Sequence, residues 1–189
     1  MVKKPQKPPI LPPDPNVTAI DHTVPMSHEK LIGRFVVEWS KLESTMDDLI
    51  WKFLGIPFEY GRIVTSHMDA TGKIKILRQL IETSFGHSSH DYVMFSYFKE
   101  ALDHIDIIRI DRNLIVHGTW GRNQQRIPMS LSLRIRDTPS TVVSETFDDI
   151  RMRDLIQKIH AAKWAMIYAM DSANAAHHRS REQFQLMIP

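Results

Sequence analysis

The feature that most constrains the fold is an apolar stripe at helical spacing in the first third of the chain. Large apolar side chains recur three and four residues apart, so they fall on one face of an α-helix. Gly55 and Pro57 follow the stripe, and a glycine followed by a proline is typical of a helix end. We therefore predict one long helix that begins near Ser27. The residues of the stripe are Leu31, Phe35, Trp39, Leu42, Met46, Leu49 and Phe53.

The same spacing predicts further helices downstream. A short helix is expected over residues 58–67 and a longer one over residues 71–85. Ser88 and Asp91 have the spacing of a capping box. The next helix is therefore expected to begin there and to continue to His117.

After His117 the pattern changes to that of a β-hairpin followed by a last helix. Residues 127–136 and 141–147 are strand-like, and the segment between them has the composition of a turn. Thr146 and Asp149 offer a capping box for the last helix. Its inward face is expected to hold Met152, Leu155, Ile159, Ala162 and Met166.

These elements predict a mostly α fold, an up-down bundle of four to five helices with a small β-hairpin insertion before the last helix. We assign residues 26–182 to this domain and residues 183–189 to a short tail. Residues 1–25 hold seven of the eleven prolines and three lysines, so this arm is expected to be disordered. A docking peptide or a basic tether to RNA is the alternative for the arm.

Composition excludes some chemistry. The chain has no cysteine, which excludes disulfides, thiol nucleophiles and thiolate zinc sites. No apolar run approaches the roughly 18 residues of a membrane span, and no signal peptide is recognisable, so a cytoplasmic protein without a membrane partner is expected. The histidines form no convincing ligand set, and neither a metal nor a cofactor is expected. The formal net charge of +2 does not by itself indicate a nucleic-acid partner.

The helix predicted to end at His117 carries a charge inside its apolar stripe. A charged side chain at Arg112 is costly there unless it is paired or opens onto a site. A second apolar row runs alongside, as in a helix that meets both its own domain and a partner. The first row is Met94, Phe98, Ala101, Ile105, Ile108, Arg112 and Ile115, and the second is Ile107, Ile110, Leu114 and His117.

Glu43 is a candidate partner for Arg112. It lies seven residues from both Val36 and Ile50, so it also falls in an apolar stripe. A carboxylate on one core-facing helix can fix a guanidinium on another. Three outcomes stay open: a structural ion pair, an orienter of a catalytic arginine, or two residues that never meet.

Arg112, Asn113 and His117 together have the chemistry for metal-free RNA cleavage. Histidine can move protons near neutral pH, and arginine can hold two phosphate oxygens. Asn113 shares a helix face with His117, where its amide could fix the tautomer of the ring or contact phosphate. Arg112 and His117 lie about 140° apart around an ideal helix. We therefore expect them to converge between two chains rather than within one. A helix-capping role is the alternative for His117.

Basic residues follow this stretch closely. A basic ribbon beside it would suit an RNA backbone, and a solvated hairpin face is the alternative. Trp120 could stack on a base or pack against the fold. The basic residues are Arg122, Arg126, Arg134 and Arg136.

The stretch from Arg112 to Trp120, Arg-Asn-Leu-Ile-Val-His-Gly-Thr-Trp, resembles the R-N-x-x-x-H signature of HEPN domains (higher eukaryotes and prokaryotes nucleotide-binding). The resemblance covers roughly residues 27–180. It implies a helical homodimer with an active site across its two-fold axis. It also implies a hydrolase, a ribonuclease that binds RNA and cleaves it by attack of the 2′-OH, leaving a 2′,3′-cyclic phosphate. Such proteins often act as toxins or defence effectors that an antitoxin or regulatory protein restrains.

Two other function classes stay open. One is a non-catalytic helical binding or dimerisation module that keeps the motif for structure. The other is a nucleotide-binding regulator. RNA cleavage that persists in EDTA and is lost on changing His117 separates the enzyme from the module, and saturable nucleotide binding without cleavage would identify the regulator.

Overall fold

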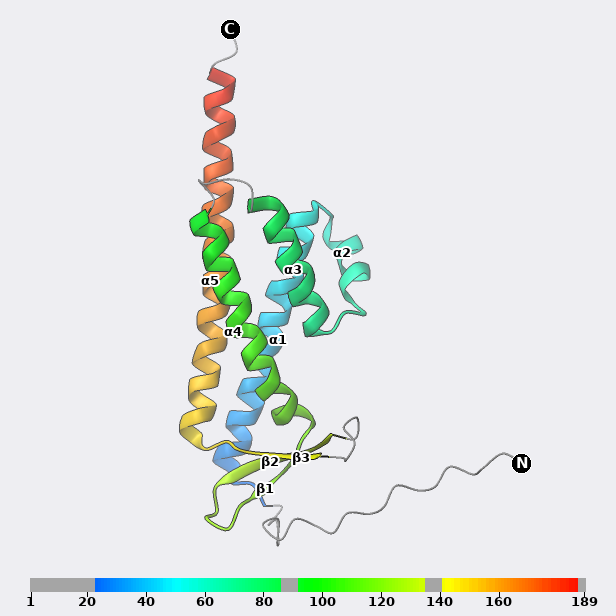
Figure 1. The fold of residues 1–189 in the computed structure, drawn as a ribbon, viewed down its shortest axis with the longest axis vertical. Coiled ribbons are helices and arrows are strands. Elements are labelled where there is room, and N and C mark those ends of the chain that lie inside the picture. Colours follow the sequence, from blue (N-terminus) through cyan, green and yellow to red (C-terminus); the bar gives the residue numbers. More distant parts are fainter. Residues whose placement is uncertain (1–22, 86–91, 135–140, 187–189) are drawn as a thin grey trace, which may run out of the picture.

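The computed structural model describes residues 23–85, 92–134 and 141–186, which form a bundle of helices with a small sheet at one end (Figure 1). The predicted fold class, a mostly α bundle with a β insertion before the last helix, is confirmed. The elements are α1 (Met26–Leu54), α2 (Phe58–Thr65), α3 (Ala70–Phe85), α4 (Tyr92–His117), β1 (Thr119–Arg122), β2 (Pro128–Arg134), β3 (Thr141–Thr146) and α5 (Asp149–Leu186).

The long first helix is confirmed as α1, and its apolar stripe faces the core. Six of the seven predicted residues are buried, and Phe53 is partly buried against the same core. Gly55 ends the helix in the left-handed conformation, with φ 63°, which favours glycine because a side chain is strained there. Pro57 then precedes the first residue of α2. The helix therefore ends where the sequence predicts.

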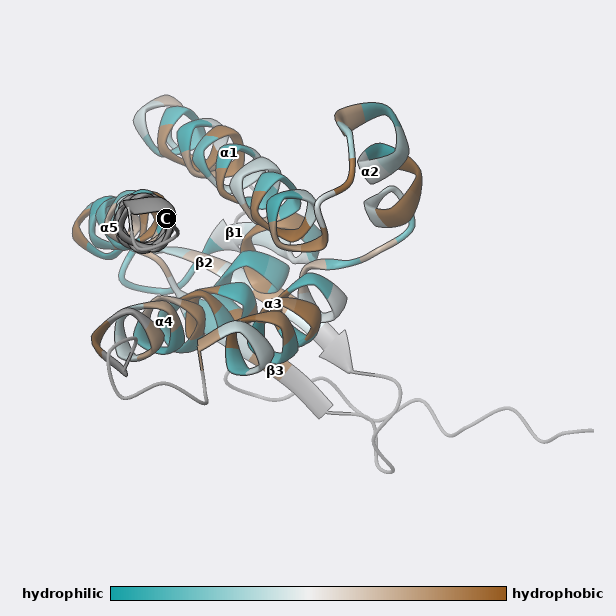
Figure 2. Cartoon of the chain, turned by 90° about the horizontal axis from the view of Figure 1, so that it is seen from above, coloured by the Kyte–Doolittle hydropathy of each residue, from teal (hydrophilic) through white to brown (hydrophobic). Residues whose placement is uncertain are grey.

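Four helices surround the core in a closed ring. α1 packs against α5, α5 against α4, α4 against α3, and α3 against α1. Figure 2 looks along this bundle and shows α2 outside it, next to α1. α2 and the loop after it return the chain along the bundle, so that α3 can run beside α1 (Figure 1). The five predicted inward residues of α5 are all buried.

Helix starts differ in detail from the predictions. α3 begins at Ala70, where the Asp69 side chain accepts a hydrogen bond from the Gly72 amide at 2.8 Å. The expected capping box of Ser88 and Asp91 lies outside the described residues. The expected capping box of Thr146 and Asp149 is wrong, because the Asp148 carboxylate caps α5 by accepting from the Arg151 amide at 2.7 Å.

α5 is longer than the predicted domain. It continues to Leu186, past residue 182, and residues 187–189 lie outside the described part of the chain. No helix in the described ranges combines the length and the apolar character needed to cross a membrane.

The predicted hairpin is present as β2 and β3, and it belongs to an antiparallel sheet of order β1-β2-β3. The sequence analysis missed β1, which pairs Thr119 with Leu131 and Arg122 with Pro128. A four-residue strand that contains a glycine has too little alternation to be recognised by pattern. β1 matters because it brings the chain directly from the end of α4 under the bundle.

Gly118 stands at the junction of α4 and β1, where backbones approach closely. A methyl group there would collide with the carbonyl oxygen of Leu114 and the hydroxyl of Ser130, and would lie 3.1 Å from the carbonyl oxygen of Leu131. Two of these three atoms belong to the backbone and cannot rotate away. The glycine is therefore required by the contact between helix and sheet.

Glu38 links α1 to α5 through a partly buried charge cluster. Its carboxylate accepts from Lys41 at 2.8 Å and lies 2.8 Å from the His160 ring and 3.9 Å from the Lys163 amine. The hydrogen bond from Lys41 lowers the pKa of Glu38 below its ordinary value of 4.5, against the opposing effect of burial, and His160 adds to the lowering. The ionised form of Glu38 is thus the one that the fold stabilises.

The variant Glu38→Gln should lower the free energy of unfolding at pH 7 by about 1 kcal/mol, since solvent still screens the cluster. Because the pKa of Glu38 is lowered on folding, its contribution is present above pH 4.5 and is lost as the pH falls below that value. Urea denaturation at pH 7 and at low pH should show the difference between variant and wild type shrinking with acidity. A stability difference that grows on acidification would contradict a stabilising role for ionised Glu38. The control is Glu100→Gln, at an exposed site on α4.

Replacing Gly118 by alanine should destabilise the protein by about 1–3 kcal/mol, the usual cost of overpacking. The matched control is Gly33→Ala on α1, where an added methyl would meet nothing within 4 Å. That change should leave stability equal or higher, because alanine favours a helix over glycine by about 1 kcal/mol. Thermal melts of both variants test this, and equal melting temperatures would show that the junction can relax.

Candidate functional site

Arg112 lies in the core stripe of α4, as predicted, between buried Ile108 and Ile115. Its side chain is half-buried, and its guanidinium carbon lies 5.9 Å from the centre of the Trp39 ring on α1. The Arg112 Nε atom is buried without a hydrogen-bond partner. The arginine thus passes through the packed region and carries its charge to the edge of the bundle.

Arg112 and His117 meet within one chain, contrary to the expectation from helix geometry. Arg112 Nη1 lies 3.1 Å from His117 Nε2, and it also donates to Asn113 Oδ1 at 3.2 Å. The prediction compared only the directions of the two side chains around the helix axis and did not consider how far an arginine side chain extends along that axis. Five residues rise only about 7.5 Å along a helix, a distance that an extended arginine side chain can span.

The contact between the two side chains has one possible direction. A guanidinium has donors and no acceptor, so Arg112 donates and His117 Nε2 accepts. Asn113 shares the face of His117, as expected, but its oxygen is engaged by Arg112 rather than by the ring.

The end of α4 is held by side chains of the sheet. The last carbonyls of a helix have no partner within it. Here the Ser130 hydroxyl donates to the Leu114 carbonyl at 2.6 Å, and the Trp120 indole N–H donates to the Ile115 carbonyl at 2.9 Å. The ring of Trp120 also packs edge-on against His28 and lies 5.7 Å from the Phe147 ring. The packing alternative for Trp120 is therefore the one that the structure displays.

Glu43 and Arg112 line the same cavity but form no ion pair. The guanidinium extends toward the end of α4 and lies over Trp39, one helical turn before Glu43 on α1. The cavity has a volume of about 280 Å³ and is lined by Glu43, Met68, Asp69, Ala70, Thr71, Arg109, Arg112 and Asn113.

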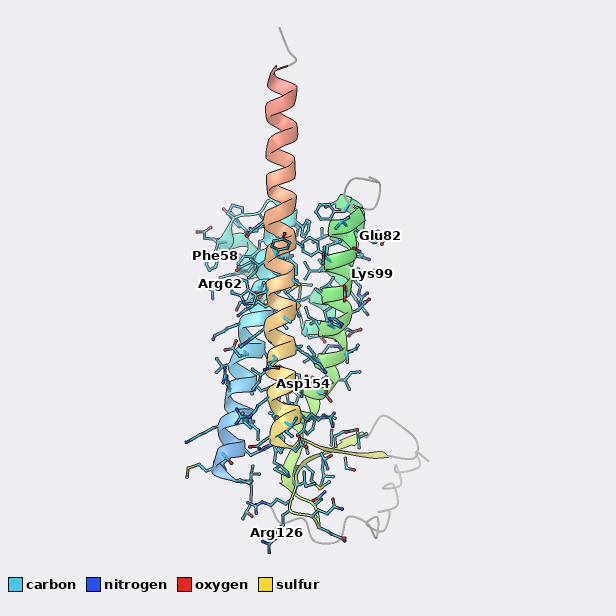
Figure 3. All side chains as sticks on the ribbon, turned by 90° about the vertical axis from the view of Figure 1, so that its left-hand side faces the viewer. Phe58, Arg62, Glu82, Lys99, Arg126 and Asp154 are labelled. Carbon is cyan, nitrogen blue, oxygen red and sulfur yellow. The ribbon has the colours of Figure 1, made fainter. Side chains whose placement is uncertain are left out.

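Of the four basic residues after the motif, the structure describes the side chains of two, so the basic ribbon stays a prediction. Arg122 and Arg126 lie at one end of the sheet, where Asn123 organises a turn and Arg126 has φ 62°. Figure 3 shows Arg126 at the end of the molecule that carries the sheet. Arg134 is at the far end of β2, about 20 Å away for six residues of extended chain, and its side chain is outside the described set. Arg136 is outside the described residues altogether.

The predicted second apolar row of α4 is only partly a free surface. Ile107 and Ile110 are 63% and 50% exposed, and His117 is exposed. Leu114 is 6% exposed, so its place in this row is wrong. The sheet covers the last turn of α4, and Ser130 on β2 donates a hydrogen bond to the Leu114 carbonyl there. The prediction from helical spacing could not include this sheet contact.

The sequence analysis did not single out Arg151, an arginine that, unlike Arg112, is paired with carboxylates. It bonds to Asp111 and Glu145, both at 2.9 Å, and to the Thr146 carbonyl at 2.8 Å. Burial opposes its charge, but the two carboxylates outweigh this effect and raise the pKa of Arg151 above its ordinary value. Arg112 has no carboxylate within ion-pair distance among the described residues. Only the fold could reveal this contrast, because the partners of Arg151 lie up to 40 residues away in the chain.

Within the described ranges no group of three or more histidine, cysteine, aspartate or glutamate side chains is arranged to hold a metal ion. No protein-family model, no curated protein and no solved structure matches the chain.

Proposed function

We propose that this protein is a metal-independent endoribonuclease of the HEPN type, acting in the cytoplasm, with Arg112 and His117 as its catalytic residues. The observation that carries the proposal is their contact at the exposed end of α4. There Arg112, which has no carboxylate partner among the described residues, lies 3.1 Å from His117 Nε2. A cation beside a base is what cleavage through the ribose 2′-OH requires.

In the proposed reaction His117 Nε2 takes the proton of the 2′-OH while the 2′-oxygen attacks the adjacent phosphorus. The bond between phosphorus and the 5′-oxygen breaks, which leaves a 2′,3′-cyclic phosphate and a 5′-hydroxyl. Arg112 stabilises the charge that develops on the phosphorane oxygens. The leaving 5′-oxygen takes its proton from the His117 of a second copy of the chain, which acts in its protonated, imidazolium form once its ring is released from Arg112.

The contact between Arg112 and His117 belongs to the substrate-free protein in this scheme. A phosphate offers the guanidinium two charged acceptors, which are stronger partners than a neutral ring nitrogen. When Arg112 turns to the phosphate, His117 Nε2 is released to act as a base. Asn113, whose oxygen accepts from Arg112, is the positioning residue for the guanidinium. Glu43 makes no hydrogen bond or ion pair with Arg112.

The dimer expected from the family resemblance would form on the remaining exposed row of α4. Ile107 and Ile110 are exposed apolar side chains on the helix that carries the motif. A symmetric contact there brings two copies of α4 together. The same resemblance extends the proposal to a toxin or defence effector that an antitoxin restrains. Arg122 and Arg126 would contribute to RNA binding from the sheet.

Substitution of His117 or Arg112 by alanine should reduce RNA cleavage about 100-fold or more, since one proton-transfer group is typically worth 10²–10⁴ in rate. Cleavage by the wild type should persist in EDTA and stop when the scissile ribose is 2′-deoxy. Sequencing of the fragment ends with detection of cyclic phosphate measures the product. His104→Ala and Arg153→Ala, exposed sites on α4 and α5, are the matched controls.

Cleavage that survives both His117→Ala and Arg112→Ala would remove the motif from the mechanism. A folded wild type that leaves all RNA intact, including total cellular tRNA, would favour the binding module or the nucleotide-binding regulator.

The variant Ile110→Asp should be monomeric and inactive if the proposed α4 surface forms the dimer. A buried unpaired carboxylate at a symmetric contact costs several kcal/mol, and symmetry imposes that cost twice. Sedimentation at micromolar concentration measures the association state. Ile150→Asp, at an 80% exposed position on α5, should leave association unchanged. A monomeric wild type that cleaves RNA would refute the dimer while leaving the chemistry intact.

A further inference from the structure

A cavity beside Arg112 is lined mostly by residues outside the Arg-Asn-His motif. It lies where the middle of α1, the first residues of α3 and the second half of α4 come together. Its volume of about 280 Å³ is near the lower end of small-molecule sites, about 300 Å³. One flat heterocycle fits such a space, and a longer ligand would have to extend out of it.

Free hydrogen-bonding groups in the cavity wall define what it can hold. Glu43 has no ion pair or hydrogen bond with any described residue, so both carboxylate oxygens are available as acceptors. The amide nitrogen of Asn113 is also without a described partner, since only its oxygen is engaged. Arg109 uses its Nε atom for Asp106 at 2.9 Å, which leaves its terminal nitrogens as donors.

The wall also holds the Asp69 carboxylate, one oxygen of which accepts from the Gly72 amide, and the Thr71 hydroxyl. Within this lining, the Glu43 acceptors and the Asn113 and Arg109 donors are together complementary to guanine. Guanine presents two adjacent N–H donors, on N1 and N2, that match the two oxygens of a carboxylate. Its O6 and N7 atoms accept from arginine or amide donors. Uracil places its single N–H between two carbonyl oxygens, which a carboxylate repels. Adenine and cytosine each offer only an amino group beside an acceptor.

Arg112 connects the cavity to the reacting bond. It lines the cavity and also contacts His117, so a base held there belongs to a nucleotide next to the phosphate that Arg112 would bind. A base can enter with its pairing edge free only from a single-stranded segment.

We propose that this cavity binds one guanine of single-stranded RNA beside the scissile phosphate, with Glu43 as the residue that recognises the base. The inference rests on the proposed ribonuclease function for its role in cleavage. Guanine recognition itself does not rest on that function, because a free guanine nucleotide presents the same N1 and N2 donors as a guanine in RNA.

The first arm of the test maps cut sites on a random-sequence RNA pool. Wild type should cut with guanine enriched about 10- to 100-fold at one fixed position next to the cut, the usual effect of a bidentate base contact. Glu43→Gln should lose this enrichment, because glutamine replaces one acceptor oxygen with a donor. Glu82→Gln, an exposed carboxylate near the opposite end of α3, should keep it (Figure 3).

The second arm measures binding of GMP and of UMP to the full chain by NMR titration. GMP should bind saturably and more tightly than UMP, and Glu43→Gln should abolish the difference while Glu82→Gln keeps it. GMP binding without any RNA cleavage would support the cavity and refute the ribonuclease. Cleavage without guanine enrichment, or equal affinity for GMP and UMP, would overturn the cavity proposal and leave the ribonuclease standing.

Discussion

The contact between the end of α4 and the sheet is the constraint on which the candidate site depends. A helix end leaves its last carbonyls without partners, and these must bond to something if they are covered. Ser130 and Trp120 supply the donors, and Gly118 allows the strand to leave at close range. His117 therefore stands at a helix end that side chains of the sheet hold in place.

The contrast between two arginines explains why charge remains available at this end of the bundle. Arg151 neutralises Asp111 and Glu145 and thereby ties α5 to α4 and β3. Arg112, the next residue after Asp111, contacts an amide, a histidine ring nitrogen and an aromatic face instead. Among the described residues, Arg151 thus has two carboxylate partners and Arg112 has none.

Much of the fold was predictable because a helix or strand with one buried face has apolar residues at a regular spacing in the sequence. The stripe from Leu31 to Phe53 predicted α1, and the alternation after residue 127 predicted the hairpin. β1 was not predicted because a strand of four residues is too short to show the alternation of apolar and polar side chains. The helix cap was predicted at Thr146, two residues before its actual place at Asp148, because threonine and aspartate can both cap a helix and only the backbone path distinguishes the two positions. Leu114 was assigned to a free face because no pattern showed that the sheet covers it.

The sequence by itself determined which residues could carry the chemistry: an arginine, an amide and a histidine near the end of an amphipathic helix. That followed from side-chain type and from the 3.6-residue period, both of which are local properties. Only the tertiary structure decided that Arg112 reaches His117 within one chain, that Glu43 faces a cavity with no partner among the described residues, and that Arg122 and Arg134 lie at opposite ends of the sheet. The physical reason is that side-chain reach, helix packing and strand register depend on contacts between residues far apart in the sequence.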